Sequence, residues 1–119
     1  MPFPTRPASP GAAPKRGEVW WVRLDPSLGS EIRKTRPCLV LSTDVVNRHR
    51  RTVVVIPLFT SPEASPPLLV PIVCAGRSVV AVVDQIRTIA KERLQQRMDA
   101  VSPGHLKAVE EALRQILEL

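Results

Sequence analysis

The chain has 119 residues, of which 44% are hydrophobic, and carries a net charge of +6 with an isoelectric point near 10.4. This length suits one domain that buries a core without disulfides or metal, and the hydrophobic content is too high for a disordered chain. The apolar runs are short and are interrupted by Pro57, Pro71 or charge, so none has the length of a membrane span. The N-terminus lacks the continuous apolar segment of a signal peptide. We therefore expect a single soluble domain in the cytoplasm.

The positive charge favours a polyanionic partner, because released counterions drive the binding of basic surfaces to nucleic acid. RNA, DNA and acidic proteins all remain open on this ground. Aromatic residues amount to 3% of the chain, with no tyrosine, so contact with phosphate should matter more than base stacking. Cys38 and Cys74 lie in apolar runs, which favours buried thiols over a disulfide. With His49 and His105 they match no zinc-binding spacing, so we predict no metal and no other cofactor.

Residues 1–16 contain five prolines beside small and basic residues, and they show no apolar period. Such a composition is typical of a disordered or extended tail. We therefore assign residues 1–16 to a proline-rich tail without a role and residues 17–119 to the folded domain.

A polar loop separates the first two predicted strands. Residues 19–24 are rich in aromatic and β-branched side chains and residues 38–41 are apolar throughout, so each range predicts a strand. In the loop at residues 29–37, Glu31 and Arg36 are five residues apart. A curled loop could direct this carboxylate and this guanidinium at one substrate group. A solvated hairpin loop is the alternative that spacing alone leaves open.

A basic cluster follows the second strand. Residues 42–46 predict a single helical turn capped by a polar side chain, and Arg48, Arg50 and Arg51 come directly after it. This is the densest basic patch in the chain, and a solvated hairpin tip is its simplest interpretation. Because close cations repel one another unless something anionic is nearby, we favour a phosphate contact.

The next predicted elements are short strands separated by turns. An unbroken β-branched run predicts a buried strand over residues 52–58. In the strand that follows, Pro71 argues for an edge position or a bulge. That strand is predicted at 68–74. The elements predicted after it are a turn at 75–77, a long strand at 78–89, a helical turn at 90–94 and a short polar strand at 95–101.

The C-terminal segment predicts an amphipathic helix. Ser102 and Pro103 suit the cap and the first helical position. Apolar residues then recur at steps of three and four, at Leu106, Val109, Leu113 and Ile116, which places them on one face. Five to seven short strands and one terminal helix indicate a mainly β fold, a small bent sheet or partly open barrel on which the helix packs.

Short motifs run in order from Gly17 to the C-terminus. They are Gly-Glu-Val-Trp-Trp-Val at 17–22, Asp-Pro at 25–26, Gly-Ser-Glu at 29–31, Arg-Pro at 36–37, Asn-Arg at 47–48, Thr-Val-Val-Val-Ile-Pro-Leu at 52–58, Asp-Gln-Ile-Arg-Thr-Ile at 84–89 and Val-Glu-Glu-Ala-Leu at 109–113. In this order they resemble the MazF/PemK family of toxin endoribonucleases. The resemblance implies an SH3-like barrel closed by the helix and paired as a homodimer. It also implies a type II toxin-antitoxin system, with a MazE-like antitoxin whose acidic segment covers the basic groove.

The resemblance implies metal-independent cleavage of single-stranded RNA, with the neighbouring 2′-hydroxyl as nucleophile. Arg36 then stabilises charge on the phosphoryl oxygens, because a guanidinium stays charged and grips two oxygens at once. Glu31 is the first candidate for the base, although an ion pair with a nearby cation is its alternative; His49 is the second candidate. The functional threonine of the family corresponds to Thr60, or the alignment shifts by one and Phe59 takes its place.

Substrate binding is assigned to a further set of residues, which are Ser30, Arg48, Arg50, Arg51 and Gln85. Gln85 either hydrogen-bonds a base or makes a structural hydrogen bond. Ile32 and Lys34 depart from the residues frequent in the family, so the RNA sequence that is cut is not predicted.

The alternative function is a non-catalytic module on the same barrel, which binds nucleic acid or a protein such as gyrase, as the related CcdB toxins imply. Fold does not separate a nuclease from a binder. Glu31 beside Arg36 favours the nuclease, because a pure binder has no need of a carboxylate at its phosphate site.

Overall fold

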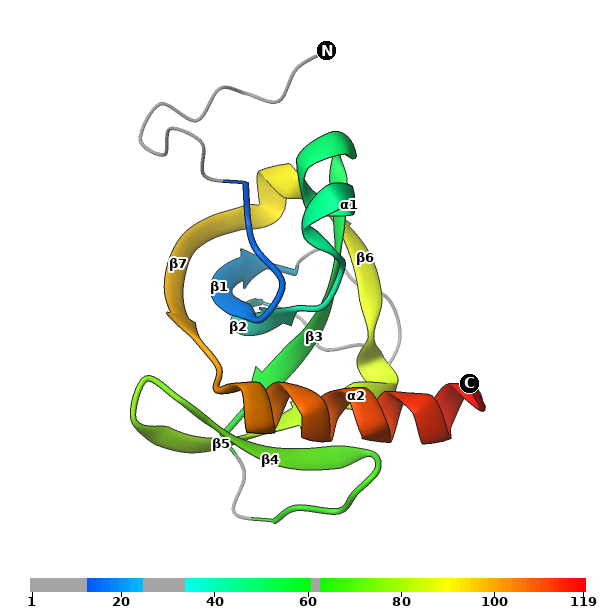
Figure 1. The fold of residues 1–119 in the computed structure, drawn as a ribbon. Helices are drawn as coiled ribbons and strands as arrows, with labels where there is room; N and C mark the ends of the chain where they lie inside the picture. Colours follow the sequence, from blue (N-terminus) through cyan, green and yellow to red (C-terminus); the bar gives the residue numbers. More distant parts are fainter. Residues whose placement is uncertain (1–12, 25–33, 61–62) are drawn as a thin grey trace.

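The computed structural model describes residues 13–24, 34–60 and 63–119. Seven strands form one curled antiparallel sheet in the order β4-β5-β3-β2-β1-β7, and β6 pairs with β3 beside this path (Figure 1). The strands are β1 (Glu18–Arg23), β2 (Thr35–Val40), β3 (Thr52–Phe59), β4 (Leu69–Cys74), β5 (Arg77–Val82), β6 (Arg87–Ala90) and β7 (Leu94–Ala100). The helices are α1 (Asp44–His49), α2 (Pro103–Leu117) and the short 3₁₀ turns η1 (Val83–Gln85) and η2 (Lys91–Arg93). The predicted fold class, mainly β with a C-terminal helix, is confirmed.

Strand β3 is the centre of the sheet, because it pairs with three other strands. Residues 55–57 pair with β2, residues 52–55 with β6, and the last two residues with β5. The strand therefore leaves one part of the curled sheet and enters another, which explains why most of its residues are buried. The buried strand predicted at 52–58 is confirmed.

The sheet has a hydrophobic cluster on each face. Side chains alternate along a strand, so in β3 Val53 and Val55 join one cluster while Ile56 and Leu58 join the other. The second of these clusters includes Val109 and Ala112 of α2. Apolar surface on both faces requires cover on both faces, and the curl of the sheet and α2 supply it.

Helix α2 begins as the sequence predicts. The Ser102 hydroxyl accepts a hydrogen bond from the backbone N–H of His105, and Pro103 occupies the first turn. The predicted apolar face packs on the core, with Val109 fully buried. The helix ends where Glu118 takes a left-handed conformation (φ 57°). Within the described ranges, no helix combines the length and the apolar character needed to cross a bilayer.

Strand β2 begins earlier than predicted. Residues 35–37, which were assigned to the polar loop, extend the β1–β2 ladder, with Thr35 opposite Arg23 and Arg36 opposite Val22. Arg36 is therefore a strand residue and not a loop residue. Pro37 is tolerated at this place because the pairing of β2 with β3 begins only at the following residue.

The long strand predicted at 78–89 is wrong, because the chain divides it into β5, η1 and β6. Strand β5 pairs with β4 and with the end of β3, whereas β6 pairs with the beginning of β3. The turn η1 redirects the chain from one part of the sheet to the other. The edge position predicted from Pro71 is confirmed, since β4 ends the sheet.

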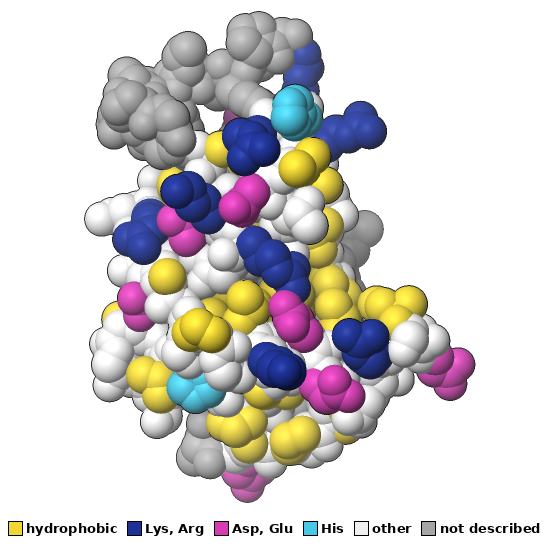
Figure 2. Space-filling view, viewed as in Figure 1, with side chains coloured by type: hydrophobic (Ala, Val, Ile, Leu, Met, Phe, Trp, Pro, Cys, Tyr) yellow, Lys and Arg dark blue, Asp and Glu magenta, His cyan; other side chains and the backbone are white. Residues whose placement is uncertain are grey.

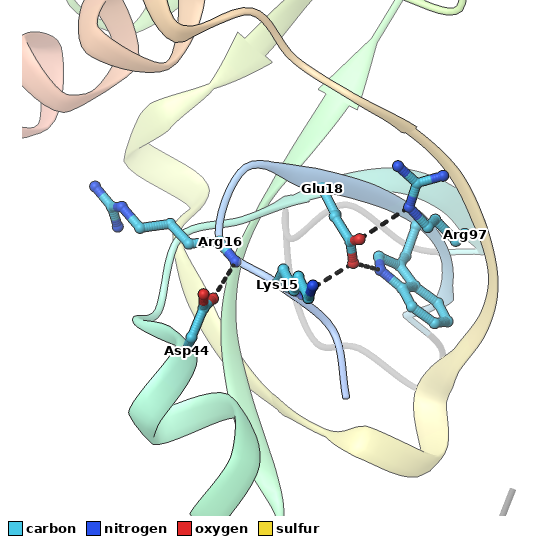
Figure 3. A network of polar contacts seen from close by, with 6 residues as sticks. Lys15, Arg16, Glu18, Asp44 and Arg97 are labelled. Carbon is cyan, nitrogen blue, oxygen red and sulfur yellow. Dashed lines mark hydrogen bonds and ion pairs between the residues drawn. The ribbon is translucent and has the colours of Figure 1, made fainter. Parts of the chain in front are cut away.

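The contacts of the folded domain include residues before Gly17. Figure 3 shows Glu18 accepting hydrogen bonds from the backbone N–H of Lys15 (2.9 Å) and from the Arg97 Nε (2.9 Å). The backbone N–H of Arg16 donates to the Asp44 carboxylate (2.9 Å), and the Arg16 guanidinium contacts the Leu41 carbonyl and the Glu110 carboxylate. Lys15 and Arg16, predicted as the end of the tail, therefore contact the domain; residues 1–12 of the predicted tail lie outside the described residues.

Candidate active site

A cavity of about 260 Å³ opens between several strands. Its lining comes from β1, β2, the end of β3, the β4–β5 hairpin and β7, and it includes the apolar side chains of Trp21, Phe59 and Met98. Arg36 and Arg77 are the charged side chains among the described lining residues, and no carboxylate is among them. The cavity therefore combines apolar walls with two positive charges, which suits a ligand that has both an apolar part and an anionic group.

Arg36 is held by an aromatic ring. Its guanidinium carbon lies 4.3 Å from the centroid of the Phe59 ring, a cation–π contact between neighbouring strands β2 and β3. Its Nε is buried and has no hydrogen-bond partner among the described residues, and none of the carboxylates described there forms an ion pair with it. An unpaired buried donor is costly. A ligand that accepts hydrogen bonds at this arginine would offset that cost.

The two cysteines near the cavity are protonated thiols. Burial raises the pKa of Cys38 to about 12, although the charges of Arg87 and Arg36 oppose the rise. Burial also raises the pKa of Cys74, and the negative charge of Asp99 adds to the effect. Both cysteines are buried free thiols that form no disulfide, which confirms the prediction from sequence. Neither supplies a thiolate nucleophile at neutral pH.

Thr60 follows β3 directly and lines the same cavity as Arg36. Its side chain is exposed, whereas the ring of Phe59 is half-buried against Arg36. The structure thus brings Arg36 and Thr60 to one cavity, and the two neighbouring residues make different contributions, a hydroxyl from Thr60 and a stacking surface from Phe59. Their catalytic roles remain predictions.

The basic cluster lies elsewhere. Arg48, Arg50 and Arg51 are exposed around the end of α1 and precede β3, whereas Phe59 ends that strand. The whole of β3 lies between the two sites along the chain, a length of roughly 23 Å for an extended strand at about 3.3 Å per residue. Figure 2 shows several Lys and Arg side chains at the end of the molecule where α1 lies. These residues do not line the cavity.

Asn47, which directly precedes the basic cluster, is structural. Asn47 is fully buried, and its side chain donates to the Ser42 carbonyl (3.0 Å) and accepts from the Ser42 hydroxyl. That hydroxyl also accepts from the backbone N–H of Val54 (3.0 Å), which joins α1 to β3. Asn47 therefore fixes the short helix that carries Arg48.

The other predicted residues are placed as follows. Gln85 lies in η1, half-buried beside α2 and β3, and does not line the cavity. His49 belongs to α1, where its Nδ1 lies 2.9 Å from the Val45 carbonyl, and it is likewise absent from the cavity lining. Ser30 and Glu31 lie outside the described residues. In the described ranges, no three His, Cys, Asp or Glu side chains gather in a group that could hold a metal ion.

Sequence reasoning missed Arg77 and the apolar wall formed by Trp21 and Met98. The turn predicted at 75–77 is observed at Ala75 and Gly76, whereas Arg77 begins β5, and a turn signal does not tell which surface the flanking side chain reaches. That direction depends on how the sheet curls, which brings the β4–β5 hairpin beside β7 (Figure 1).

The curled sheet with its terminal helix defines a fold class shared with solved toxin structures. MazF from Deinococcus radiodurans superposes with a TM-score of 0.82 at 24% identity, over 91% of this chain and 99% of that chain. An endoribonuclease in complex with its cognate antitoxin, from a mycobacterial species, has a TM-score of 0.76 at 27% identity, over 90% and 97% of the two chains.

Sequence comparison gives the family. Residues 15–117 match the family described as PemK-like, MazF-like toxin of type II toxin-antitoxin system. The chain is similar to endoribonuclease MazF9 of Mycobacterium tuberculosis, with 36% identity over 88% of this chain and 97% of the relative. It is 34% identical to endoribonuclease EndoA of Bacillus subtilis, over 88% and 95% of the two chains. The protein belongs to the PemK/MazF toxin family.

Proposed function

We propose that this protein is the toxin of a type II toxin-antitoxin system and cleaves single-stranded RNA at specific sequences. The observation that carries the proposal is Arg36, a guanidinium in a cavity with an unpaired buried Nε and no carboxylate partner among the described residues. The relatives named endoribonuclease support it. Cleavage of cellular mRNA would stop translation and growth.

The proposed reaction uses a nucleophile from the substrate. The 2′-hydroxyl oxygen attacks the adjacent phosphorus, the bond from phosphorus to the 5′ oxygen breaks, and the products are a 2′,3′-cyclic phosphate and a 5′-hydroxyl. A base takes the 2′-hydroxyl proton and an acid gives a proton to the leaving oxygen, so no metal and no protein nucleophile is required. The protonated thiols of Cys38 and Cys74 agree with that chemistry.

Arg36 is assigned to the charge that develops on the phosphoryl oxygens. Donors placed for charge that appears only in the transition state lower the barrier without strengthening ground-state binding. Thr60, with an exposed hydroxyl at the same cavity, is assigned to the phosphoryl or leaving oxygen. Glu31 is assigned as the base; His49 is the weaker candidate because it does not line the cavity.

The partners follow from the same proposal. A relative of the same fold was solved in complex with its cognate antitoxin. We assign this chain a MazE-like antitoxin, whose acidic segment would neutralise the basic surface, and a homodimeric state in the cytoplasm. Sedimentation at micromolar concentration should give the dimer mass, and the monomer mass alone would contradict the homodimer.

The test of the proposed function is incubation of the purified protein with a long RNA in excess EDTA, followed by mapping of the new ends. Cleavage at recurring short sequences, with a 5′-hydroxyl on each downstream fragment, is expected. Arg36→Ala, purified in parallel, controls for contaminating nucleases. Intact RNA would favour a binding module for nucleic acid or for a protein such as gyrase, and cleavage that needs added Mg²⁺ would contradict the metal-independent mechanism.

A further inference from the structure

The hairpin between β4 and β5 brings a second cation to the cavity. Its two turn residues, Ala75 and Gly76, both have positive φ (52° and 76°). A two-residue hairpin turn of this kind matches the right-handed twist of the strands that it joins. Cys74 and Arg77 pair across the turn, and both line the cavity. Arg77 is exposed and belongs to a strand that does not pair with β2. The cavity therefore receives its two arginines from separate parts of the sheet.

Asp99 of β7 holds this hairpin in place. Its Oδ2 accepts a hydrogen bond from the backbone N–H of Ala75 at 2.6 Å. The N–H groups of Ala75 and Ala100 lower the pKa of Asp99, so the carboxylate is charged at neutral pH. Ala75 is an unusual residue for a left-handed conformation. The Asp99 carboxylate thus ties the β4–β5 turn to β7. Because Arg77 directly follows this turn, the same hydrogen bond helps to fix the position of Arg77.

The electrostatics of the cavity favour an anion with more than one charge. Arg36 and Arg77 line it together, and neither forms an ion pair with a carboxylate in the described part of the chain. Two cations that share an apolar cavity repel each other unless an anion lies between them or beside each of them. A single RNA strand carries one phosphate per nucleotide, so an RNA whose scissile phosphate lies at Arg36 presents a neighbouring phosphate to the same cavity.

We propose that Arg77 binds the RNA phosphate adjacent to the scissile phosphate, and that Asp99 is the positioning residue for the hairpin that carries it. This inference rests on the proposed function. Arg77 then acts in substrate binding, whereas Arg36 acts in the chemical step. Arg77 also sets the register of the RNA, because the phosphate that it binds determines which neighbouring linkage meets Arg36 in the chemical step.

The experiment uses an RNA analogue with a 2′-deoxy group at the mapped cleavage site, which binds but is not cut. Arg77→Ala should weaken equilibrium binding roughly tenfold and reduce the slope of log affinity against log salt concentration by about 0.7. Arg77→Lys should keep the slope, since a point charge suffices for a phosphate. Arg114→Ala, which removes an exposed arginine from α2, is the charge-matched control and should leave affinity unchanged.

Single neutral methylphosphonate linkages then locate the contact. One such linkage, next to the cleavage site on one side or the other, should weaken binding by the wild-type protein. Arg77→Ala should be insensitive to that linkage but should respond to the other linkages as the wild type does. Cleavage by the wild type together with an unchanged salt slope and unchanged linkage pattern in Arg77→Ala would overturn this inference and leave the proposed function intact. Absence of cleavage by the wild type would overturn the proposed function itself.

Asp99→Ala tests the positioning role. The variant should lose affinity and become less sensitive to the same methylphosphonate linkage, and its effect should be small in the Arg77→Ala background, because both act through one contact. Effects that add fully in the double variant would show that Asp99 does not act through Arg77, and would overturn that part of the inference.

Discussion

The guanidinium of Arg36 is oriented by an aromatic ring, in contrast to the carboxylate partner that is common for buried arginines. The 4.3 Å contact with Phe59 restricts the plane of the guanidinium without neutralising its charge. A carboxylate in the same place would compete with the scissile phosphate for the same donors. Stacking therefore leaves the full charge of Arg36 available to the substrate.

Phe59→Leu should impair the chemical step more than binding. A cation–π contact contributes about 0.5 to 2 kcal/mol, so its loss should lower single-turnover cleavage by roughly 2- to 30-fold. Phe59→Tyr, which keeps the ring face, should retain most activity. If Phe59 acts through Arg36, the loss on Phe59→Leu should vanish in the Arg36→Ala background. An equal loss in both backgrounds would contradict the positioning role.

Cys38 predicts an alkaline limit of stability. Its pKa is raised from 9.0 to about 12 in the folded state, so its contribution is fully present below pH 9.0 and is lost as the pH rises toward 12. The unfolded state then binds fewer protons, and the free energy of unfolding should fall by about 1 kcal/mol per pH unit from this group. Urea unfolding at pH 8 to 10.5 should show a smaller decline for Cys38→Ala than for the wild type. Parallel declines would contradict the assignment.

At the residue scale, the sequence predicted Arg36 as a phosphate contact and Thr60 as a second residue of the same catalytic site. It did not predict the Phe59 contact, because that contact requires β2 and β3 to pair, and pairing between strands is not a local property of either one. Arg77 was not predicted either, because its place at the cavity also depends on how distant strands are arranged.

At the scale of elements, local chemistry explains most of what could be predicted. The cap at Ser102, the edge position of Pro71 and the buried run of β3 all follow from short-range rules, and the structure contains each of them. The break between β5 and β6 could not be predicted from the valine-rich run at 79–83. It arises because β5 pairs with the end of β3 whereas β6 pairs with the beginning of β3, so the chain must change direction between them. Tertiary pairing overrides strand propensity there.

The hairpin tie between Ala75 and Asp99 predicts a titration at low pH. The lowered pKa of Asp99 means that the contribution of this carboxylate is present above its ordinary value of 3.8 and is lost as the pH falls through the lower folded-state value. The amide proton resonance of Ala75 should therefore shift with a midpoint below pH 3.8. Asp99→Asn should abolish that titration. A midpoint at or above 3.8 would show that the hydrogen bond does not stabilise the charged form.

At the scale of the whole molecule, two cationic surfaces lie toward opposite ends of β3. Arg48, Arg50 and Arg51 surround the end of α1, while Arg36 and Arg77 line the cavity near the other end. The cluster contains no acid and meets phosphates as a set of point charges. An RNA that contacts both surfaces must extend along the strand, so the cluster should add affinity without entering the reaction.

The central claim, that Arg36 supplies chemistry while the basic cluster supplies binding, is tested most directly by one comparison of variants. Single-turnover cleavage at saturating enzyme is measured beside equilibrium binding to the 2′-deoxy analogue, for Arg36→Ala, for Arg36→Lys and for the triple alanine variant of Arg48, Arg50 and Arg51. The triple variant should lose affinity and reduce the salt slope by about 2, with cleavage at saturation nearly unchanged. Arg36→Ala should lose roughly 10²- to 10³-fold in cleavage with little change in affinity, and Arg36→Lys should recover little of it. Equal losses of cleavage and affinity in Arg36→Ala would contradict the account, because Arg36 would then be a binding residue.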